Sequence, residues 1–278
     1  MSWYVGQISP ANWGWLRDYF GGDPPWPMDA VPHIALARAI REGRDPGQTS
    51  FYEYLRASHA HPAERLRQSI ETVRFWIEQP AVTITVEVDC VVDGNHRFAV
   101  ASTDPAIHME FEAREPYQTL RWPDQQATTG RRRPGRLGDI AAELAGLRVL
   151  ELGCAQGAVS IEAAQAGARV LAVDARLTST PWRLRDAWGL RQQITFEPVD
   201  LNGPWMPPDV DVVLAMSIRA HLRPGRLEEL IAGRRCVLET HTAEETPPVT
   251  HDWRRVGDVP YSHAEPVRRR TLYWGVPR

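Results

Sequence analysis

The sequence contains no lysine, so all 32 of its basic residues are arginines. A GC-rich coding sequence accounts for this bias, and a chemical preference for the guanidinium fork on phosphates is the alternative explanation. Cysteine is also scarce. Cys90, Cys154 and Cys236 form no C-x-x-C pair, which excludes a disulfide framework and a paired-cysteine metal site.

No run of apolar residues approaches the roughly 18 that a membrane helix needs. The first ten residues, MSWYVGQISP, lack the charged-then-apolar pattern of a secretory signal. We therefore expect a cytosolic protein without a membrane partner. The net charge of −3 also counts against a surface that coats nucleic acid. Its 278 residues, 43% of them hydrophobic, have room for two modest domains with buried cores.

The most informative segment is VLELGCAQG at residues 149–157, followed by RVLAVD at 169–174. The pattern predicts an apolar strand, a glycine turn into a small-residue helix, and a second strand that ends in Asp174. Gly153 and Gly157 would let the backbone approach a ligand closely. The helix N-terminus would offer unpaired N–H groups, and Asp174 would accept hydrogen bonds from ribose hydroxyls. These features indicate a site for a nucleoside-bearing cofactor.

The glycine spacing bears on which cofactor this is. A dinucleotide site needs G-x-G-x-x-G, and this chain lacks the middle glycine. Glu151, two residues before Gly153, would repel a pyrophosphate and attract an ammonium group. S-adenosylmethionine carries an ammonium group and no phosphate. The segment resembles motif I of the class I methyltransferases, E/D-x-G-x-G-x-G, with Ala155 in place of the middle glycine. NAD and a degenerate fold that binds nothing are the alternatives.

The remaining pattern predicts an α/β protein of two domains. Residues 123–136, PDQQATTGRRRPGR, are typical of a linker, in which Arg131 to Arg133 would be a solvated charge run. After them, apolar strands alternate with helices, which indicates a parallel sheet covered on both faces. Two late segments look like a closing hairpin. This order resembles the Rossmann-like sheet of class I methyltransferases over residues 137–278, and residues 1–122 would form a smaller α+β domain.

The resemblance implies a set of cofactor-binding residues at strand ends and in the glycine turn. They are Glu151, Gly153, Cys154, Gly157, Asp174, Asp200 and Met216. Open α/β sheets bind their ligands outside the carboxyl ends of the strands.

Candidate catalytic residues follow the fourth and fifth strands of this sheet. SIRAHL at 217–222 resembles the S-V-L-H-H-L stretch of many small-molecule methyltransferases, so His221 could take a proton from a hydroxyl nucleophile. A structural histidine is the alternative. Glu239 and His241 end the fifth strand and would face the same cleft, where Glu239 could orient a substrate hydroxyl. Because the sulfonium supplies the leaving group, alignment of donor and acceptor can provide much of the rate.

A second motif is DGNHR at residues 93–97, a glycine turn that enters a helix carrying His96 and Arg97. Backbone N–H groups, the helix dipole and a guanidinium would converge on a phosphate there. The pentapeptide resembles the D-G-x-H-R turn of the ParB and sulfiredoxin superfamily, which implies that Asp93, Gly94, His96 and Arg97 bind phosphate or substrate. Asn95 replaces the sulfiredoxin cysteine, so sulfinic acid reduction is not expected. A histidine and arginine that only cap the helix are the alternative.

Two other patterns are weaker indications of a functional site. DPPW at residues 23–26 looks like the box of adenine-N6 DNA methyltransferases, but it does not follow an apolar strand and is better interpreted as a proline-rich loop. His33, His59 and His61 lack carboxylate or cysteine partners at ligand spacing, so we expect no metal.

The sequence thus predicts S-adenosylmethionine-dependent methyl transfer to an oxygen of a small-molecule or carbohydrate-like acceptor, and nucleic acid is not the expected acceptor. A phosphorylated or nucleotide-linked acceptor is one option. The first alternative is a ParB-type protein that binds or hydrolyses nucleotides and has a vestigial methyltransferase half. A nucleic-acid methyltransferase is a weaker alternative.

Overall fold

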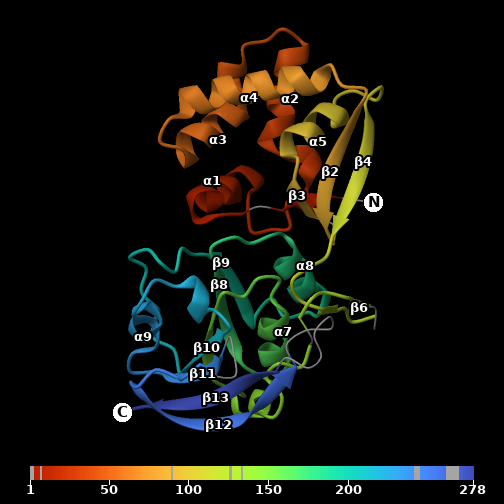
Figure 1. The fold of residues 1–278 in the computed structure, drawn as a ribbon. Coiled ribbons are helices and arrows are strands. Elements are labelled where there is room, and N and C mark those ends of the chain that lie inside the picture. The colour runs from red at the N-terminus through yellow and green to blue at the C-terminus, as the bar shows by residue number, and fades with distance from the viewer. Residues whose placement is uncertain are drawn as a thin grey trace. The chain divides into compact units, whose positions relative to one another are not determined.

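The computed structural model describes residues 3–6, 8–88, 90–124, 127–132, 134–240, 245–260 and 269–278. The chain divides into two compact units (Figure 1). Unit 1 is Met1–Glu115 with Thr178–Thr180, and unit 2 is Pro116–Leu177 with Pro181–Arg278.

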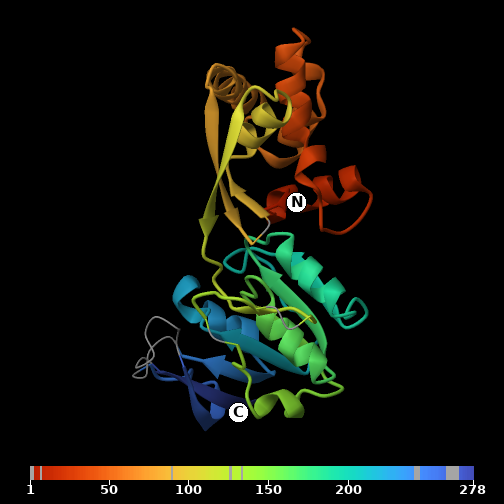
Figure 2. The same cartoon turned by 90° about the vertical axis from the view of Figure 1, so that its right-hand side faces the viewer.

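Unit 1 contains a four-stranded sheet and five helices. The strands lie in the order β1 (Tyr4–Val5), β3 (Cys90–Asp93), β2 (Ala81–Glu87), β4 (His108–Arg114). The helices are α1 (Pro10–Phe20), α2 (Pro32–Arg41), α3 (Ser50–Ser58), α4 (Pro62–Ile77) and α5 (Asn95–Ser102), with short 3-10 turns at Met28–Ala30 and Pro46–Gln48. The parallel strands β2 and β4, gold and yellow, run side by side in both views (Figure 1, Figure 2).

Side-chain patterns account for these elements. In β2 the β-branched residues Val82, Ile84 and Val86 alternate with more exposed positions, as a sheet with one buried face requires. Helix α4 begins at Pro62, a residue whose fixed φ suits the first helical position. Helix α5 packs against β2, and both α2 and α4 pack on α5.

Unit 2 is built on a seven-stranded sheet in the order β12-β13-β11-β10-β7-β8-β9. Its strands are β7 (Arg148–Leu152), β8 (Arg169–Asp174), β9 (Ile194–Pro198), β10 (Val212–Met216), β11 (Arg235–Glu239), β12 (His251–Pro260) and β13 (Arg269–Pro277). Five strands, β7 to β11, run parallel, and β13 is antiparallel to both β11 and β12. The predicted parallel sheet and closing hairpin are therefore confirmed.

Helices and turns connect these strands. They are α6 (Ile140–Glu143), α7 (Ala158–Gln165), α8 (Thr180–Ala187), α9 (Arg226–Ile231) and the 3-10 turn η3 (Arg219–His221). Strand β10 lies at the centre of the sheet and is buried at every position, which explains its unbroken apolar sequence VVLAM. Leu227, Leu230 and Ile231 of α9 pack in the same core cluster.

The expectation of a solvated linker over residues 123–136 is wrong for the described part of this segment. A short strand β6 (Ala127–Thr128) pairs with β5 (Leu120–Arg121), and Arg132 N–H donates to the Tyr117 carbonyl over 2.9 Å. Arg132 and Arg136 are each only 6% exposed. Arg131 is exposed, as expected of a solvated charge run, whereas the Arg132 guanidinium lies 4.9 Å from the Tyr117 ring centroid and Arg136 pairs with the distant Glu239 over 2.7 Å. Arg133 lies outside the described residues.

The DPPW segment is a turn that contributes to the core of unit 1, as the loop interpretation predicted. Trp26 is 2% exposed and stacks on Phe20 with 5.3 Å between ring centroids. Its indole N–H donates to the Gly22 carbonyl over 2.9 Å, and Asp23 pairs with Arg17 over 3.0 Å. These side chains have structural partners within the unit.

No helix among the described residues is sufficiently long and apolar to span a bilayer. No group of three or more metal-ligating side chains occurs within that part of the chain.

Candidate functional site

A cavity of about 320 Å³ lies in unit 2 at the carboxyl ends of the parallel strands. It collects residues that follow β7, β8, β9 and β10. Its lining consists of Tyr117, Gly153, Ala155, Asp174, Ala175, Arg176, Asp200, Leu201, Asn202, Met216, Ser217, Ile218, His221 and Leu222. We call it the strand-end cavity. Of the predicted cofactor residues, Gly153, Asp174, Asp200 and Met216 line it together with His221.

The turn after β7 forms one wall of this cavity and requires glycine at its first position. Gly153 has a φ of 73°, and a Cβ there would lie 2.5 Å from Cδ1 of Ile218. Ala155, in place of the middle glycine of the methyltransferase motif, has a φ of 51°. Left-handed backbone costs an L-residue about 1–2 kcal/mol, so Ala155 is a strained position in this turn.

Asp174 joins this turn to the tip of β8. Its Oδ2 accepts the N–H of Ala155 and its Oδ1 accepts the N–H of Arg176, each over 3.0 Å. Burial raises the pKa of Asp174, and these backbone donors oppose that rise. A carboxylate has about four acceptor positions, so Asp174 is fixed in place and still has capacity for a ligand.

Asp200 and Met216, two of the cofactor-binding residues that the resemblance implies, both line the strand-end cavity. Asp200 is exposed, and its Oδ1 accepts the N–H of Asn202 over 2.9 Å. Met216, 4% exposed, ends β10. The exposed His221 follows in η3, where its carbonyl accepts from the Asn202 side chain over 3.0 Å. The lining of the strand-end cavity therefore includes two carboxylates and an imidazole.

Three predicted cofactor residues lie behind the cavity lining. Glu151 and Cys154 are fully buried, and Gly157 caps α7. The Ser160 hydroxyl donates to Glu151 Oε2, whereas Glu151 Oε1 is buried and has no hydrogen-bond partner among the described residues. Burial raises the pKa of Glu151 to about 7. An unsatisfied carboxylate oxygen in the interior costs stability.

The predicted unpaired N–H groups at the start of α7 are partly occupied. The Ala158 N–H donates to Oε1 of Gln118 over 3.0 Å, and Gln118 N–H donates to Oε1 of Gln156 over 3.1 Å. A glutamine from a distant segment thus caps the helix. This cap was invisible in the sequence because Gln118 lies 40 residues away.

Glu239 ends β11. It does not line the strand-end cavity itself but contacts Ser217, which does. It is 3% exposed and accepts from Arg136 over 2.9 Å. Arg270 approaches it at 3.3 Å, and the hydroxyl of Ser217, a lining residue, donates to it. Burial alone would raise the pKa of Glu239, but Arg136, Ser217 and Arg270 hold it below its usual range. Such a carboxylate is a poor proton acceptor. His241 lies outside the described residues.

Unit 1 contains a separate cavity of about 470 Å³ around the DGNHR turn. Its lining consists of His33, Arg65, Thr72, Trp76 and residues 93–97. We call it the DGNHR cavity. Gly94 has a φ of 95° and precedes α5. Arg97 pairs with Asp93 over 2.6 Å and lies 5.5 Å from the Trp76 ring centroid.

Two histidines form the apolar side of the DGNHR cavity. His33 and His96 contact edge to face, with 4.9 Å between ring centroids. Burial and then the charge of Arg65 lower the pKa of His96 to about 4. Burial, with a smaller effect of His96, also lowers the pKa of His33. His96 Nε2 and His33 Nδ1 are buried without a hydrogen-bond partner in the described structure. Both rings are therefore neutral at pH 7.

Sequence reasoning missed several lining residues of both cavities. Tyr117 precedes the segment that was interpreted as a linker. Arg65 and Trp76 lie on helix α4, for which the sequence indicated no ligand. Neither position carries a motif. Only the tertiary contacts bring them to the cavities.

No protein-family model and no curated protein sequence matches the chain. Solved structures resemble roughly half of it. WbdD, crystallised with a kinase inhibitor, has 18% identity over 51% of this chain and 40% of its own length, with a TM-score of 0.40. Magnesium protoporphyrin IX methyltransferase of Synechocystis PCC 6803, crystallised with S-adenosylmethionine, has 20% identity over 51% of this chain and 78% of its own, with a TM-score of 0.40. The [4+2]-cyclase SpnF has 16% identity over 59% and 88%, with a TM-score of 0.41. The aligned part spans less than half of WbdD, and scores at this level do not say what this chain binds.

Proposed function

We propose that unit 2 is an S-adenosylmethionine-dependent methyltransferase. One observation carries the proposal: Gly153, Asp174, Asp200 and Met216, from four different strand ends, line a single open cavity. That is where open α/β sheets bind ligands. A degenerate fold that binds nothing would favour a cavity filled by the protein's own side chains. The strand-end cavity is open instead.

The residues present fit this cofactor. Asp174 would accept from the ribose hydroxyls, Asp200 would lie by the adenine amino group, and Met216 would pack below the ring. The buried, unpartnered Oε1 of Glu151 would compensate the ammonium charge from behind the glycine turn. A dinucleotide would instead bring a pyrophosphate toward Glu151 and Asp174, where two carboxylates repel it.

When bound, S-adenosylmethionine supplies an activated methyl group on a sulfonium. The contribution of the chain is then to hold the acceptor in line with that methyl group and to exclude water. We propose a small-molecule or carbohydrate-like acceptor that reacts at oxygen, with His221 as the base that takes its proton. Glu239, held ionised by two arginines, would keep Ser217 in place and would not act as a base.

Isothermal titration of the full chain with S-adenosylhomocysteine tests this proposal. We expect binding in the micromolar range, and Asp174→Ala should weaken it by about 1–3 kcal/mol through loss of charged hydrogen bonds. Asp139→Asn, an exposed aspartate outside the cavity, is the control and should bind as the wild type does. Absence of binding by the wild type at high micromolar concentration would contradict the proposal.

We also propose that the DGNHR cavity of unit 1 binds the phosphate of a nucleotide or of a phosphorylated substrate. Arg65, Arg97 and the start of α5 surround a polar hollow, and Gly94 leaves its backbone accessible. Titration with nucleoside triphosphates and with orthophosphate is the test. Arg97→Ala should abolish binding, whereas Arg56→Ala, an exposed arginine on α3, should leave it unchanged.

A further inference from the structure

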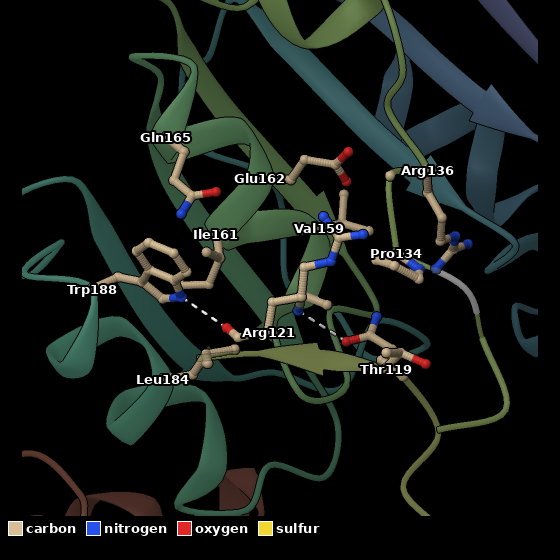
Figure 3. Close-up of a pocket in the computed structure, with 13 residues that line it drawn as sticks. Thr119, Arg121, Pro134, Arg136, Val159, Ile161, Glu162, Gln165, Leu184 and Trp188 are labelled. Carbon is tan, nitrogen blue, oxygen red and sulfur yellow. Dashed lines mark hydrogen bonds between the residues drawn. The ribbon is translucent and has the colours of Figure 1, made fainter. Parts of the chain in front are cut away.

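A third cavity of about 190 Å³ lies in unit 2 and shares no lining residue with the strand-end cavity. It is bounded by α7, by the end of α8, and by residues 118–121 and 134–136 (Figure 3). The chain passes directly between the two hollows, because Tyr117 lines one and Gln118 lines the other. We call it the α7 side cavity.

The floor of the α7 side cavity is apolar and rigid. Val159, Ile161 and Leu184 are each at most 5% exposed. The indole of Trp188 forms a further wall, and its N–H donates to the Arg121 carbonyl over 2.8 Å (Figure 3). A ring held in this way offers a flat contact surface at low entropic cost.

Two opposite charges lie above this floor. Glu162 projects from α7, and the Arg121 side chain extends from β5 toward the same helix (Figure 3). Burial raises the pKa of Glu162, and the backbone N–H groups of Leu137 and Arg136 oppose the rise. Among the residues that the structure describes, Glu162 and Arg121 form no ion pair with each other or with a third group. Arg136, the other cation in the lining, is already held by Glu239 over 2.7 Å.

We infer that the α7 side cavity binds a zwitterionic α-amino acid with an apolar side chain. Its ammonium would lie on Glu162, its carboxylate on Arg121, and its side chain on Val159, Ile161 and the Trp188 ring. A purely apolar ligand would displace water from both charges and offer neither of them an opposite charge. A ligand with one charge would satisfy one group and meet a like charge on the other. This site does not depend on the proposed methyl transfer.

Three probes that share a phenylethyl group separate these possibilities on the full chain. L-Phenylalanine carries both charges, 2-phenylethylamine only the positive one, and 3-phenylpropionate only the negative one. Isothermal titration or ligand-observed NMR should detect L-phenylalanine, with each analogue bound at least tenfold more weakly. L-Leucine, which has a smaller side chain, should also bind.

Matched variants assign the charges. Arg121→Gln should weaken L-phenylalanine about tenfold and strengthen 2-phenylethylamine, because the like charge is removed, and Glu162→Gln should weaken L-phenylalanine and strengthen 3-phenylpropionate for the same reason. Arg169→Gln, an exposed arginine at the start of β8, is the control. Circular dichroism verifies that each variant is folded. Equal binding of the three probes, or no binding of either amino acid at millimolar concentration, would overturn the inference.

Discussion

The carboxylate of Asp174 accepts the backbone N–H of Ala155 over 3.0 Å, and this bond joins the tip of β8 to the turn that follows β7. The same carboxylate accepts the N–H of Arg176. One side chain therefore shapes the turn and also lines the strand-end cavity. Substitutions at this position act on the turn and on the ligand together.

We expect Asp174→Asn to separate these two effects in part. The amide oxygen can accept from one backbone N–H group, but the amide nitrogen cannot accept from the other. The variant should lose about 1–2 kcal/mol of unfolding free energy and bind S-adenosylhomocysteine more weakly than the wild type. Urea denaturation and calorimetric titration measure the two quantities. Unchanged values in both would show that Asp174 neither holds the turn nor touches the cofactor.

Glu151 should make stability depend on pH. Its folded pKa of about 7 lies above its unfolded value near 4.5, so the folded state binds the extra proton between these limits. The unfolding free energy contributed by this group is intact below about pH 4.5 and falls as pH rises toward 7, by up to about 3 kcal/mol. Glu151→Gln should remove this slope. Urea denaturation at pH 5 and pH 8 measures it, with the exposed Glu110→Gln as control.

The same variant tests the proposed role in binding. If Glu151 compensates the cofactor ammonium, Glu151→Gln should bind S-adenosylhomocysteine more weakly at pH 8 while being more stable. If the difference in unfolding free energy between pH 5 and pH 8 is the same in Glu151→Gln as in the wild type, burial does not raise the pKa of Glu151 as proposed. A variant with unaltered affinity would contradict the contact with the ammonium.

Removal of the Glu239 carboxylate should destabilise unit 2 strongly. Arg136 and Arg270, 6% and 1% exposed, would then lose the carboxylate that they share. Breaking a buried ion pair from one side costs about 3–5 kcal/mol. Thermal and urea unfolding of Glu239→Gln should show this loss, whereas Glu228→Gln, near the surface, should change stability by less than about 1 kcal/mol. A small effect at Glu239 would mean that water reaches the two arginines.

His96 should report on occupancy of the DGNHR cavity. Its pKa of about 4 lies below the unfolded value near 6.5, so its neutral form stabilises unit 1 above about pH 6.5. That contribution is lost as pH falls toward 4. A bound phosphate would favour the charged ring and raise the pKa of His96. An NMR titration of its ring protons with and without a nucleoside triphosphate measures this, and identical titration curves would argue against phosphate binding near His96.

The strand pattern and the glycine turn were predictable because they depend on local chemistry. Apolar strands of five or six residues, positive-φ glycines and strand-terminal acids are visible one segment at a time. Parallel pairing then brings the carboxyl ends of such strands to one edge of the sheet. For this reason Gly153, Asp174, Asp200 and Met216 were found from sequence, and all four line one cavity.

Contacts between distant segments were not predictable in the same way. Gln118 caps α7 from 40 residues away, and Arg136 reaches Glu239 across 103 residues. A polar, proline-bearing segment was therefore interpreted as a linker, although its Arg132 and Arg136 are buried. The composition of a segment indicates whether its side chains favour contact with water. It does not show which buried groups in distant segments those side chains pair with.

The sequence by itself determined the order of strands and helices, the glycine positions and the identity of the acids at the strand tips. Tertiary structure decided which of those groups reach a cavity and which are enclosed. Asp174 remains accessible, whereas Glu151, on the neighbouring strand, is fully buried against Ser160. The physical reason is that a side chain's direction follows from local backbone geometry, but its exposure depends on what the rest of the chain packs against it.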